Sequence, residues 1–415
     1  MPLLSIQLTL IYMCPSPSIN RLRLNKDADR RLHGGHLWIY SNEVAVKQTP
    51  LKTFAMGEQV IVEDAKGKAI GVAMMNPQSL ICARLVSRNE TPLDAALITQ
   101  RIQSALTLRE LTLREQGVTK PFYRLVYGDS DLLPGLVIDR FGDYFSVQLN
   151  SAGMDQLSSA IVDVLNHLFK PKGILLKNDS SARDAEGLEK HVVTASGTVP
   201  DLVELEENGT RFLAPLASGQ KTGWFYDHRI NRREMQALVK DKKVLDVFSY
   251  VGAWGVQALH AGAKSAICID SSEQALRIAR KNAELNNQKN NLSTIQGSAT
   301  DVLKQLVADK KTFDVVVLDP PAFIKKQKDK GSGTEAYHQH NQLALRLLNP
   351  DGVLISASCS MHLKRDELVN IIRVAGNKTH RNLQVFYQGG QGPDHPVHPA
   401  IAETEYLKAI FTLVR

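Results

Sequence analysis

The chain has few cysteines, no apolar run long enough to cross a membrane, and no internal repeat or low-complexity segment. Its 4 cysteines lie far apart, with no pair at metal-ligand spacing. We therefore expect reduced thiols, no structural zinc or other metal, and a reducing compartment. The apolar residues 1–14 are too short to span a bilayer, and no positive charge precedes them as in a secretion signal, so they are expected to form an extra strand or a loose extension. These absences predict a cytoplasmic protein with no membrane partner and an N-terminal extension at residues 1–17.

The excess of positive over negative charge is also small. Lys and Arg number 50 against 43 Asp and Glu, which leaves a net charge of +7. This mild surplus permits a polyanionic partner but does not prove one. The length of 415 residues predicts two or three domains, and 43% hydrophobic residues suffice for ordinary buried cores. A homodimer stays open.

The spacing of apolar runs divides the chain into three predicted domains of the α/β class. Residues 18–95 carry short alternating runs with Gly and Pro between them, which predicts a small β-barrel. Residues 96–200 predict a compact α+β module. In residues 201–415 strands alternate with helices, which predicts a mostly parallel sheet that binds ligands beyond the C-terminal ends of its strands.

Two helices are predicted at or within the middle domain. One opens near Pro92, with Thr91 as its expected N-cap, because proline is favoured at the first helical turn. The other runs from Met154 to Phe169 by its apolar spacing.

A glycine-spaced turn follows one strand of the last domain. The apolar run that ends at Asp246 leads into Gly252-X-X-Gly255, where glycines let a ligand approach the backbone closely. Asp270 ends the next strand, where its carboxylate would accept hydrogen bonds from ribose hydroxyls. This pattern marks nucleoside cofactors in general and does not separate NAD from S-adenosylmethionine. A tight turn without a ligand, and a carboxylate at a helix N-terminus, are the alternatives.

Two further strand ends favour methyl transfer to a planar base. In Asp319-Pro-Pro-Ala-Phe323 the prolines fix the backbone, the carboxylate would accept a base N–H, and Phe323 would stack. Cys359 ends another apolar run, in Ser-Cys-Ser. A thiolate that adds to carbon 6 of cytosine makes carbon 5 nucleophilic, and Asp319 would stabilise the adduct by sharing a proton with ring N3. The residues therefore predict a pyrimidine C5 methyltransferase.

Other interpretations stay open at this point. An Asp-Pro-Pro-aromatic motif also suits transfer to an exocyclic amine or ring nitrogen of a purine, which needs no thiol. A non-catalytic RNA-binding or assembly factor on a methyltransferase scaffold belongs to a different class. Cys359 by itself also fits a small buried apolar residue.

From about Ile19 onward the chain resembles the bacterial large-subunit ribosomal RNA cytosine-5 methyltransferases that carry an N-terminal PUA domain. The resemblance rests on residues 36–44, 124–140, 220–229, 319–321, 358–360 and 394–397. It implies a Rossmann-like methyltransferase domain, preceded by a PUA-like β-barrel and a middle α+β domain. It also implies S-adenosyl-L-methionine as cofactor and ribosomal RNA, of the 23S kind, as partner.

The resemblance also implies roles for individual residues. Cys359 would be the nucleophile and Asp319 its partner at the base. The residues implied for the cofactor are Thr222, Asp227, Arg229, Asp246, Phe248, Ser249, Tyr250, Gly252, Asp270, Ser271, Ser298 and Asp319. Ser298 stands where the family usually has an acid at the adenine amino group, and a hydroxyl accepts that bond more weakly.

Basic residues are the expected RNA contacts. In the PUA-like domain the expected phosphate ligands are Arg21, Arg23, Lys26, Arg30 and Arg31. Lys325 opens a Gly- and Lys-rich segment, expected to be a mobile loop that ends near Gly333 and closes over RNA. A solvated face or an ordinary surface loop is the alternative. The stiff segment that contains His395 and His398 is expected near the base pocket, and neither histidine is assigned a catalytic role.

Overall fold

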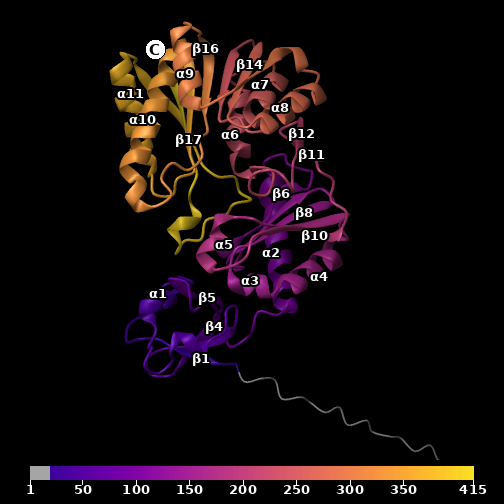
Figure 1. Cartoon of the computed structure of the whole chain (residues 1–415), viewed down its shortest axis with the longest axis vertical. Coiled ribbons are helices and arrows are strands. Elements are labelled where there is room, and N and C mark those ends of the chain that lie inside the picture. The colour runs from indigo at the N-terminus through magenta and orange to yellow at the C-terminus, as the bar shows by residue number, and fades with distance from the viewer. Residues whose placement is uncertain (1–18) are drawn as a thin grey trace, which may run out of the picture.

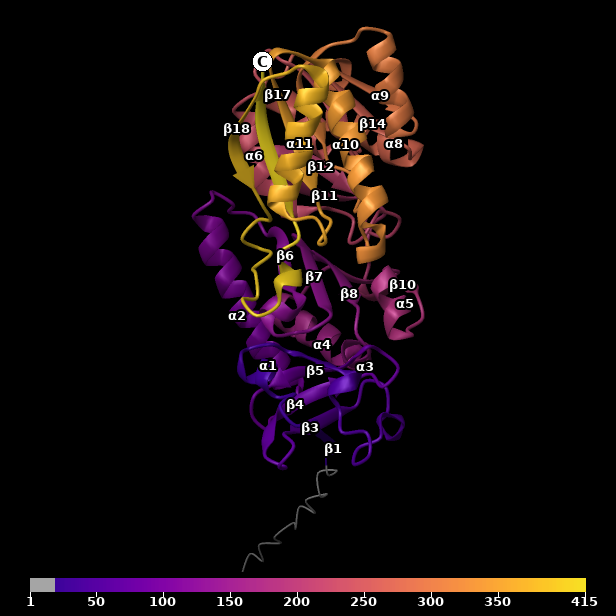
Figure 2. The ribbon, with the colours of Figure 1, turned by 90° about the vertical axis from the view of Figure 1, so that its left-hand side faces the viewer.

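The computed structural model describes residues 19–415, so the predicted extension at residues 1–17 lies outside the described residues. Three units follow one another along the long axis of the molecule (Figure 1). The N-terminal unit lies at one end, the middle unit in the centre and the C-terminal unit at the other end (Figure 2). No helix in the described range is both long and apolar enough to cross a membrane.

The N-terminal unit is a five-stranded sheet with the order β1-β3-β4-β5-β2. Its elements are β1 (Arg21–Arg23), α1 (Arg30–His33), β2 (Trp38–Tyr40), β3 (Gln59–Glu63), β4 (Ala69–Met75) and β5 (Ile81–Ser87). A bridge between Leu24 and Val44 links the chain beyond the two edge strands. The sheet is therefore closed in the manner that the short alternating runs predict.

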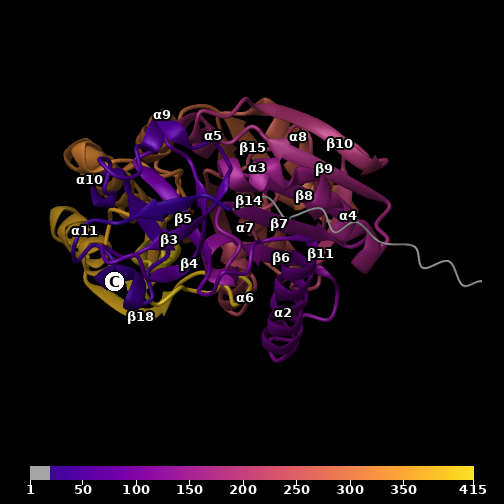
Figure 3. The same cartoon turned by 90° about the horizontal axis from the view of Figure 1, so that it is seen from below.

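The middle unit is a second five-stranded sheet, with the order β10-β9-β8-β7-β6. Its elements are α2 (Ala95–Arg114), β6 (Phe122–Tyr127), β7 (Leu136–Phe141), β8 (Tyr144–Leu149), α3 (Ala152–Gln156), α4 (Ser158–Phe169), β9 (Gly173–Asn178), α5 (Ser181–Glu186) and β10 (His191–Gly197). The unit's apolar core is shared with α2, which lies at its side in the view along the long axis (Figure 3).

Two helix predictions in this region are wrong in detail. The N-cap of α2 is Asp94 and not Thr91, because the chain stays extended through the buried Leu93 and only the Asp94 carboxylate accepts the Leu97 N–H, at 2.8 Å. The helix predicted from Met154 to Phe169 is two helices, since Leu157 has φ −93° and ψ 12°.

The C-terminal unit begins with the hairpin of β11 (Val203–Glu207) and β12 (Thr210–Ala214), followed by α6 (Arg229–Gln236). A seven-stranded sheet follows, with the order β15-β14-β13-β16-β17-β19-β18. Its elements are β13 (Lys243–Val247), α7 (Ala253–His260), β14 (Ser265–Asp270), α8 (Glu273–Leu285), β15 (Leu292–Gln296), α9 (Ala299–Ala308), β16 (Phe313–Leu318), α10 (Lys330–Leu347), β17 (Leu348–Ser358), α11 (Arg365–Thr379), β18 (Leu383–Gly389) and β19 (Lys408–Val414).

The first five strands of this sheet are parallel, and β19 is antiparallel to β17 and β18. Central strands such as Phe313–Leu318 are buried almost throughout, as expected when helices cover both faces. The predicted α/β class with a mostly parallel sheet is therefore confirmed. The three larger sheets and the β11–β12 hairpin lie within the three predicted domain ranges, whose boundaries stay predictions.

The Lys-rich loop is shorter than predicted. Helix α10 begins at Lys330, and Gly333 lies inside it, so close to Ile324 that an added Cβ would lie 2.4 Å from that side chain. Lys330 also pairs with Glu367 of α11 at 2.6 Å. The segment after Asp319-Pro-Pro therefore turns into a packed helix before it reaches Gly333.

A connecting segment, residues 390–407, joins β18 to β19 and leaves the C-terminal unit. Figure 1 shows it in yellow, running beside the middle unit toward the N-terminal unit. Ile401 is fully buried in the core of the N-terminal unit, and the Tyr127 hydroxyl of the middle unit donates to the Thr404 carbonyl at 3.0 Å. This one segment therefore contacts all three units.

Candidate active site

The parallel strands bring the predicted reactive groups to one edge of the sheet. Strand β13 lies between β14 and β16, and β16 lies between β13 and β17. The C-terminal ends of these strands carry Asp246, Asp270, Asp319 and Cys359. Ligands bind at this edge in open parallel sheets.

The turn after β13 has an unusual backbone. Phe248, Tyr250 and Gly252 have φ values of +65°, +49° and +80°. Alternating conformations of this kind turn successive N–H groups toward one concavity. Asp270 supports the turn, because its Oδ2 accepts the Tyr250 N–H at 2.8 Å. The Ser249 hydroxyl is buried in the turn with no partner among the described residues.

Asp246 lies fully buried beneath this turn. Its Oδ2 accepts the Gly255 N–H at 2.9 Å, while its Oδ1 has no partner among the described residues. Burial, together with the nearby charges of Asp319 and Asp270, raises the pKa of Asp246 to about 7. Gly255 is required here, since an added Cβ would lie 2.6 Å from the Cys268 sulfur.

The remaining residues implied for the cofactor fall into two groups. Ser271 and Ser298 are exposed just beyond β14 and β15. Asp227 is buried and accepts the Tyr406 hydroxyl at 2.5 Å. Thr222 and Arg229 are buried in contacts with the middle unit: the Thr222 hydroxyl donates to Asp139, and the Arg229 guanidinium donates to the Phe122 carbonyl. The structure therefore places these two side chains in contacts between units rather than at the strand ends.

Asp319 is held by two groups that the sequence analysis did not single out. His228 Nε2 lies 3.1 Å from Asp319 Oδ1, and the Trp254 indole donates to Oδ2 at 3.0 Å. Burial opposes ionisation, but the contacts with the His228 imidazole and the Trp254 indole N–H outweigh it and lower the pKa of Asp319. His228 lies next to Asp227 in the segment at residues 220–229. That segment's resemblance to the family was the only feature of the sequence that pointed to a role for His228.

Cys359 is half-buried, and its sulfur lies 3.8 Å from the Pro320 carbonyl oxygen of the Asp-Pro-Pro motif. Burial raises the pKa of the thiol, and the charge of Lys221 acts in the opposite direction. The Tyr337 hydroxyl lies 2.8 Å from Ser358 Oγ and 3.0 Å from Ser360 Oγ. These contacts fix the backbone on both sides of the thiol.

Lys408 is a buried lysine that contacts the loop around Cys359. The sequence did not indicate a role for Lys408 at the site. It lies opposite Ser358 in the β17–β19 register, and its Nζ donates to the carbonyl oxygens of Ser360 and Tyr406 at 2.7 and 2.8 Å. Burial lowers the pKa of Lys408 to about 8, while the Cys359 side chain opposes that shift. A positive charge therefore lies close to the thiol at neutral pH.

Phe323 is engaged within the protein. Its ring stacks on His340 with centroids 5.4 Å apart and also contacts Phe248 and Tyr337 edge-on. Lys325, which follows it, is exposed.

The basic residues expected to bind phosphate are mostly paired. Arg21 and Arg23 both bind Glu63, at 2.5 and 2.7 Å, and Arg31 binds Glu43 at 2.7 Å. The more exposed Arg30 lies 3.0 Å from Asp27, and Lys26 is exposed. Carboxylates therefore already neutralise much of this face.

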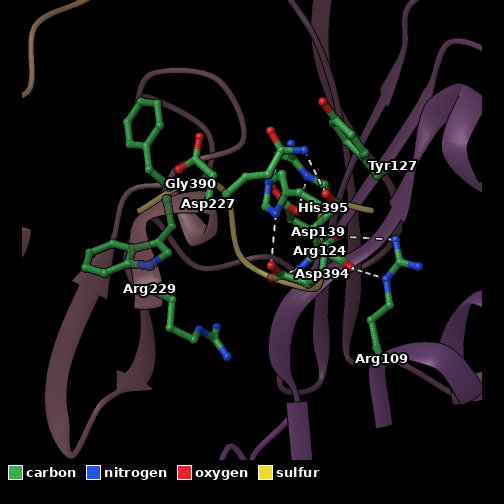
Figure 4. Close-up of polar contacts among 12 residues, drawn as sticks. Arg109, Arg124, Tyr127, Asp139, Asp227, Arg229, Gly390, Asp394 and His395 are labelled. Carbon is green, nitrogen blue, oxygen red and sulfur yellow. Dashed lines mark hydrogen bonds and ion pairs between the residues drawn. The ribbon is translucent and has the colours of Figure 1, made fainter. Parts of the chain in front are cut away.

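The segment around His395 docks on the middle unit (Figure 4). Asp394 is fully buried, accepts the Arg124 N–H at 3.1 Å and lies 2.9 Å from His395 Nδ1. Arg109 donates to the Asp394 carbonyl at 3.3 Å. His395 is thus enclosed in a contact between units, next to the Tyr127 ring.

Potential metal ligands do not cluster. Within residues 19–415 no group of three or more His, Cys, Asp or Glu side chains could hold a metal ion.

Comparison with known proteins gives this arrangement a context. Residues 22–88 match the PUA-like domain family, and residues 190–384 match the S-adenosylmethionine-dependent methyltransferase family. A methyltransferase solved in complex with SAH superposes with a TM-score of 0.81 at 21% identity, covering 95% of this chain and 100% of that one. A Streptococcus mutans structure described as a SAM-dependent methyltransferase has a TM-score of 0.79 at 20% identity, with the same coverage.

Relatives with higher identity span nearly the whole chain. Ribosomal RNA large subunit methyltransferase I of Cronobacter sakazakii is 37% identical over 394 residues, which is 94% of this chain and 98% of the relative. The protein of the same name from Escherichia coli strain SMS-3-5 is 35% identical over 393 residues, with the same coverage. The chain therefore belongs to the S-adenosylmethionine-dependent ribosomal RNA large subunit methyltransferase I family.

Proposed function

We propose that the chain methylates carbon 5 of a cytosine in large-subunit (23S) ribosomal RNA, with Cys359 as the covalent nucleophile. One observation carries the proposal: Cys359 and Asp319 end the neighbouring strands β17 and β16, beside the turn at residues 248–252. The relatives' names support ribosomal RNA as the substrate. A ribosomal RNA substrate is consistent with the cytoplasm.

The turn and the strand ends fit S-adenosylmethionine. The unpartnered polar atoms of Asp246 and Ser249 offer hydrogen bonds to a polar ligand, and the turn presents backbone N–H groups. Asp270 would accept hydrogen bonds from the ribose, with Ser271 and Ser298 beyond it. When bound, the cofactor supplies a methyl group on a positively charged sulfur.

The chain's own residues would act on the pyrimidine in a fixed order. Cys359 first loses its proton, helped by the positive charges of Lys221 and Lys408. The sulfur bonds to carbon 6, and the electron pair of the ring double bond moves to carbon 5, which accepts the methyl group. A water molecule then takes the proton from carbon 5, and the electrons of that carbon–hydrogen bond restore the ring double bond. The carbon–sulfur bond breaks, and its electron pair returns to the Cys359 sulfur. Asp319, ionised beside His228, accepts an N–H of the base throughout.

Bisulfite sequencing of ribosomal RNA tests the assignment. A strain that lacks the gene should lose one protected cytosine in the large-subunit RNA, the wild-type gene should restore it, and the Cys359→Ala variant should not. Restoration by Cys359→Ala, or a lost methyl group on a purine instead, would point to amine or ring-nitrogen transfer. Calorimetry with S-adenosylmethionine should detect binding. If no binding is detected, a non-catalytic RNA-binding factor on a methyltransferase scaffold would be favoured instead.

A further inference from the structure

A pocket lies between the N-terminal and middle units, and none of the proposed catalytic or cofactor-binding residues lines it. Its volume is about 400 Å³, and it lies among β5, the residues that follow β5, the first turns of α2, and Leu132 in the turn before β7. Leu37, Leu85, Leu97 and Leu132 form apolar walls. Arg88 and Arg101 both line the pocket, and no acidic side chain is among the described residues that line it.

Arg101 is held in this pocket without a counter-charge. Its guanidinium donates to the carbonyl oxygens of Val86 and Leu132, and no described carboxylate lies within ion-pair distance. Burial lowers the pKa of Arg101 to about 10. A guanidinium has five N–H donors, so about three remain for a ligand.

Arg101 is partly buried, and the fully buried arginines of the described chain differ from it in their partners. Each of the four with the most enclosed side chains faces a carboxylate: Arg109 with Asp131, Arg183 with Asp155, and Arg229 and Arg232 with Glu207. Even partial burial of a cation without such a partner has a cost, because the lost hydration is not offset by attraction to a carboxylate. Arg101 is therefore a cation whose charge no described carboxylate offsets.

Arg88 supplies a second guanidinium at the open side of the pocket. It is exposed, and its one hydrogen bond to the described chain goes to the Leu32 carbonyl, at 2.8 Å. Arg21, Arg23 and Arg31 of the same unit are neutralised by Glu63 and Glu43. Arg88 thus has no carboxylate partner among the described residues and lines the same pocket as Arg101 of α2.

We propose that this pocket binds a backbone phosphate of the RNA substrate between Arg88 and Arg101, with the leucine walls against the attached nucleoside. The inference rests on the proposed function, since it takes RNA as the source of the anion. Guanidinium groups match phosphate oxygens in pairs. The pocket volume lies within the range of small-molecule sites, and its apolar walls offer more contact than a free phosphate ion would use.

Filter binding of a full-length large-subunit ribosomal RNA transcript tests the site. Arg88→Gln should weaken binding about tenfold and reduce the slope of log affinity against log salt by about one between about 50 and 200 mM salt. The maximal methylation rate at saturating RNA and the affinity for S-adenosylmethionine should not change. Arg114→Gln, which removes an exposed charge at the far end of α2, is the matched control and should have little effect.

Arg101→Lys keeps the charge but loses the two-carbonyl clamp and the guanidinium fork, so it should weaken RNA binding while thermal denaturation reports any loss of folding. Equal RNA binding by Arg88→Gln and Arg114→Gln would overturn the inference alone, provided that the wild type binds and methylates RNA. Millimolar inorganic phosphate that stabilises wild type but not Arg88→Gln, with RNA binding equal in both, would reassign the pocket to a free anion. A wild type that neither binds nor methylates RNA would overturn both proposals.

Discussion

At the scale of single residues, the reactive groups were readable where a buried apolar run ends in a polar side chain. Asp270, Asp319 and Cys359 all stand at such ends. His228, Trp254 and Lys408 were not readable, because their contacts with the site join segments far apart in the chain. Resemblance to the family implied cofactor roles for Thr222 and Arg229, but both side chains contact the middle unit instead.

The pair of His228 and Asp319 predicts a pH effect. His228→Gln removes the imidazole contact that lowers the pKa of Asp319, so that pKa should rise. Asp319 then becomes protonated at higher pH, and the acid limb of the kcat/KM profile should move to higher pH. We expect the loss of activity to be on the order of tenfold on the acid side of the profile and small at neutral pH. His260→Gln, an exposed histidine at the end of α7, should leave the limb in place, and an unmoved limb in His228→Gln would contradict the pairing.

Asp270 predicts a selective loss of cofactor affinity. Asp270→Ala removes the acceptor for a ribose and the support of the Tyr250 and Ser272 N–H groups. Calorimetry should show binding of S-adenosylmethionine weakened roughly 10- to 100-fold, because hydrogen bonds to a charged acceptor are lost. RNA binding should stay the same. An unchanged cofactor affinity, equal to that of the exposed-site variant Asp309→Ala, would remove Asp270 from the cofactor site.

At the scale of elements, strands were predicted better than helix ends. The inner strands β13 and β16 of the C-terminal sheet follow apolar runs, and burial on both faces explains that pattern. The start of α2 was missed because Thr91 and Asp94 are both good caps, and only the tertiary burial of Leu93 decides between them. The start of α10 was missed because Gly331 and Gly333 read as loop residues, while contacts with Ile324 and α11 favour a helix.

The β11–β12 hairpin predicts a strong contrast between two glutamates. Glu207 is buried and accepts hydrogen bonds from Arg232, Gln257 and Trp224. Glu207→Gln leaves two arginines without a counter-charge, so the free energy of unfolding in urea should fall by about 3–5 kcal/mol. Glu204→Gln breaks only the exposed pair with Arg211 on the same hairpin and should change stability little. Equal effects would show that burial does not govern these pairs.

At the scale of the whole molecule, the three units were predicted but their contacts were not. The connecting segment 390–407 places Ile401 in the N-terminal core and Asp394 against the middle unit. Apolar periodicity cannot reveal such contacts, because a lone Ile in a loop has no pattern to read.

The docking of Asp394 predicts how stability depends on pH. His395 and neighbouring donors outweigh burial and lower the pKa of Asp394 to about 2, from 3.8. A carboxyl whose pKa is depressed on folding stabilises the protein above its unfolded value and loses that effect as pH falls toward the folded value. The difference in unfolding free energy between wild type and Asp394→Asn, on the order of 2 kcal/mol from this shift, should be constant from about pH 7 to 5 and shrink below about pH 4.

The exposed Asp143, paired with Lys172 in the middle unit, gives the control Asp143→Asn, which should differ little from wild type at any pH. A difference for Asp394→Asn that persists unchanged into acid would show that the carboxylate charge does not hold the connecting segment in place.

Attack by the Cys359 sulfur on the pyrimidine is the claim on which the proposed chemistry depends. The enzyme should be incubated with S-adenosylmethionine and RNA that contains 5-fluorocytidine, since fluorine at carbon 5 cannot leave as a proton does and the carbon–sulfur bond persists. The account predicts a denaturation-resistant protein–RNA adduct that mass spectrometry maps to Cys359, and none with Cys359→Ala. Methylation of ordinary RNA with no adduct on the fluorinated RNA, or an adduct on another residue, would contradict it.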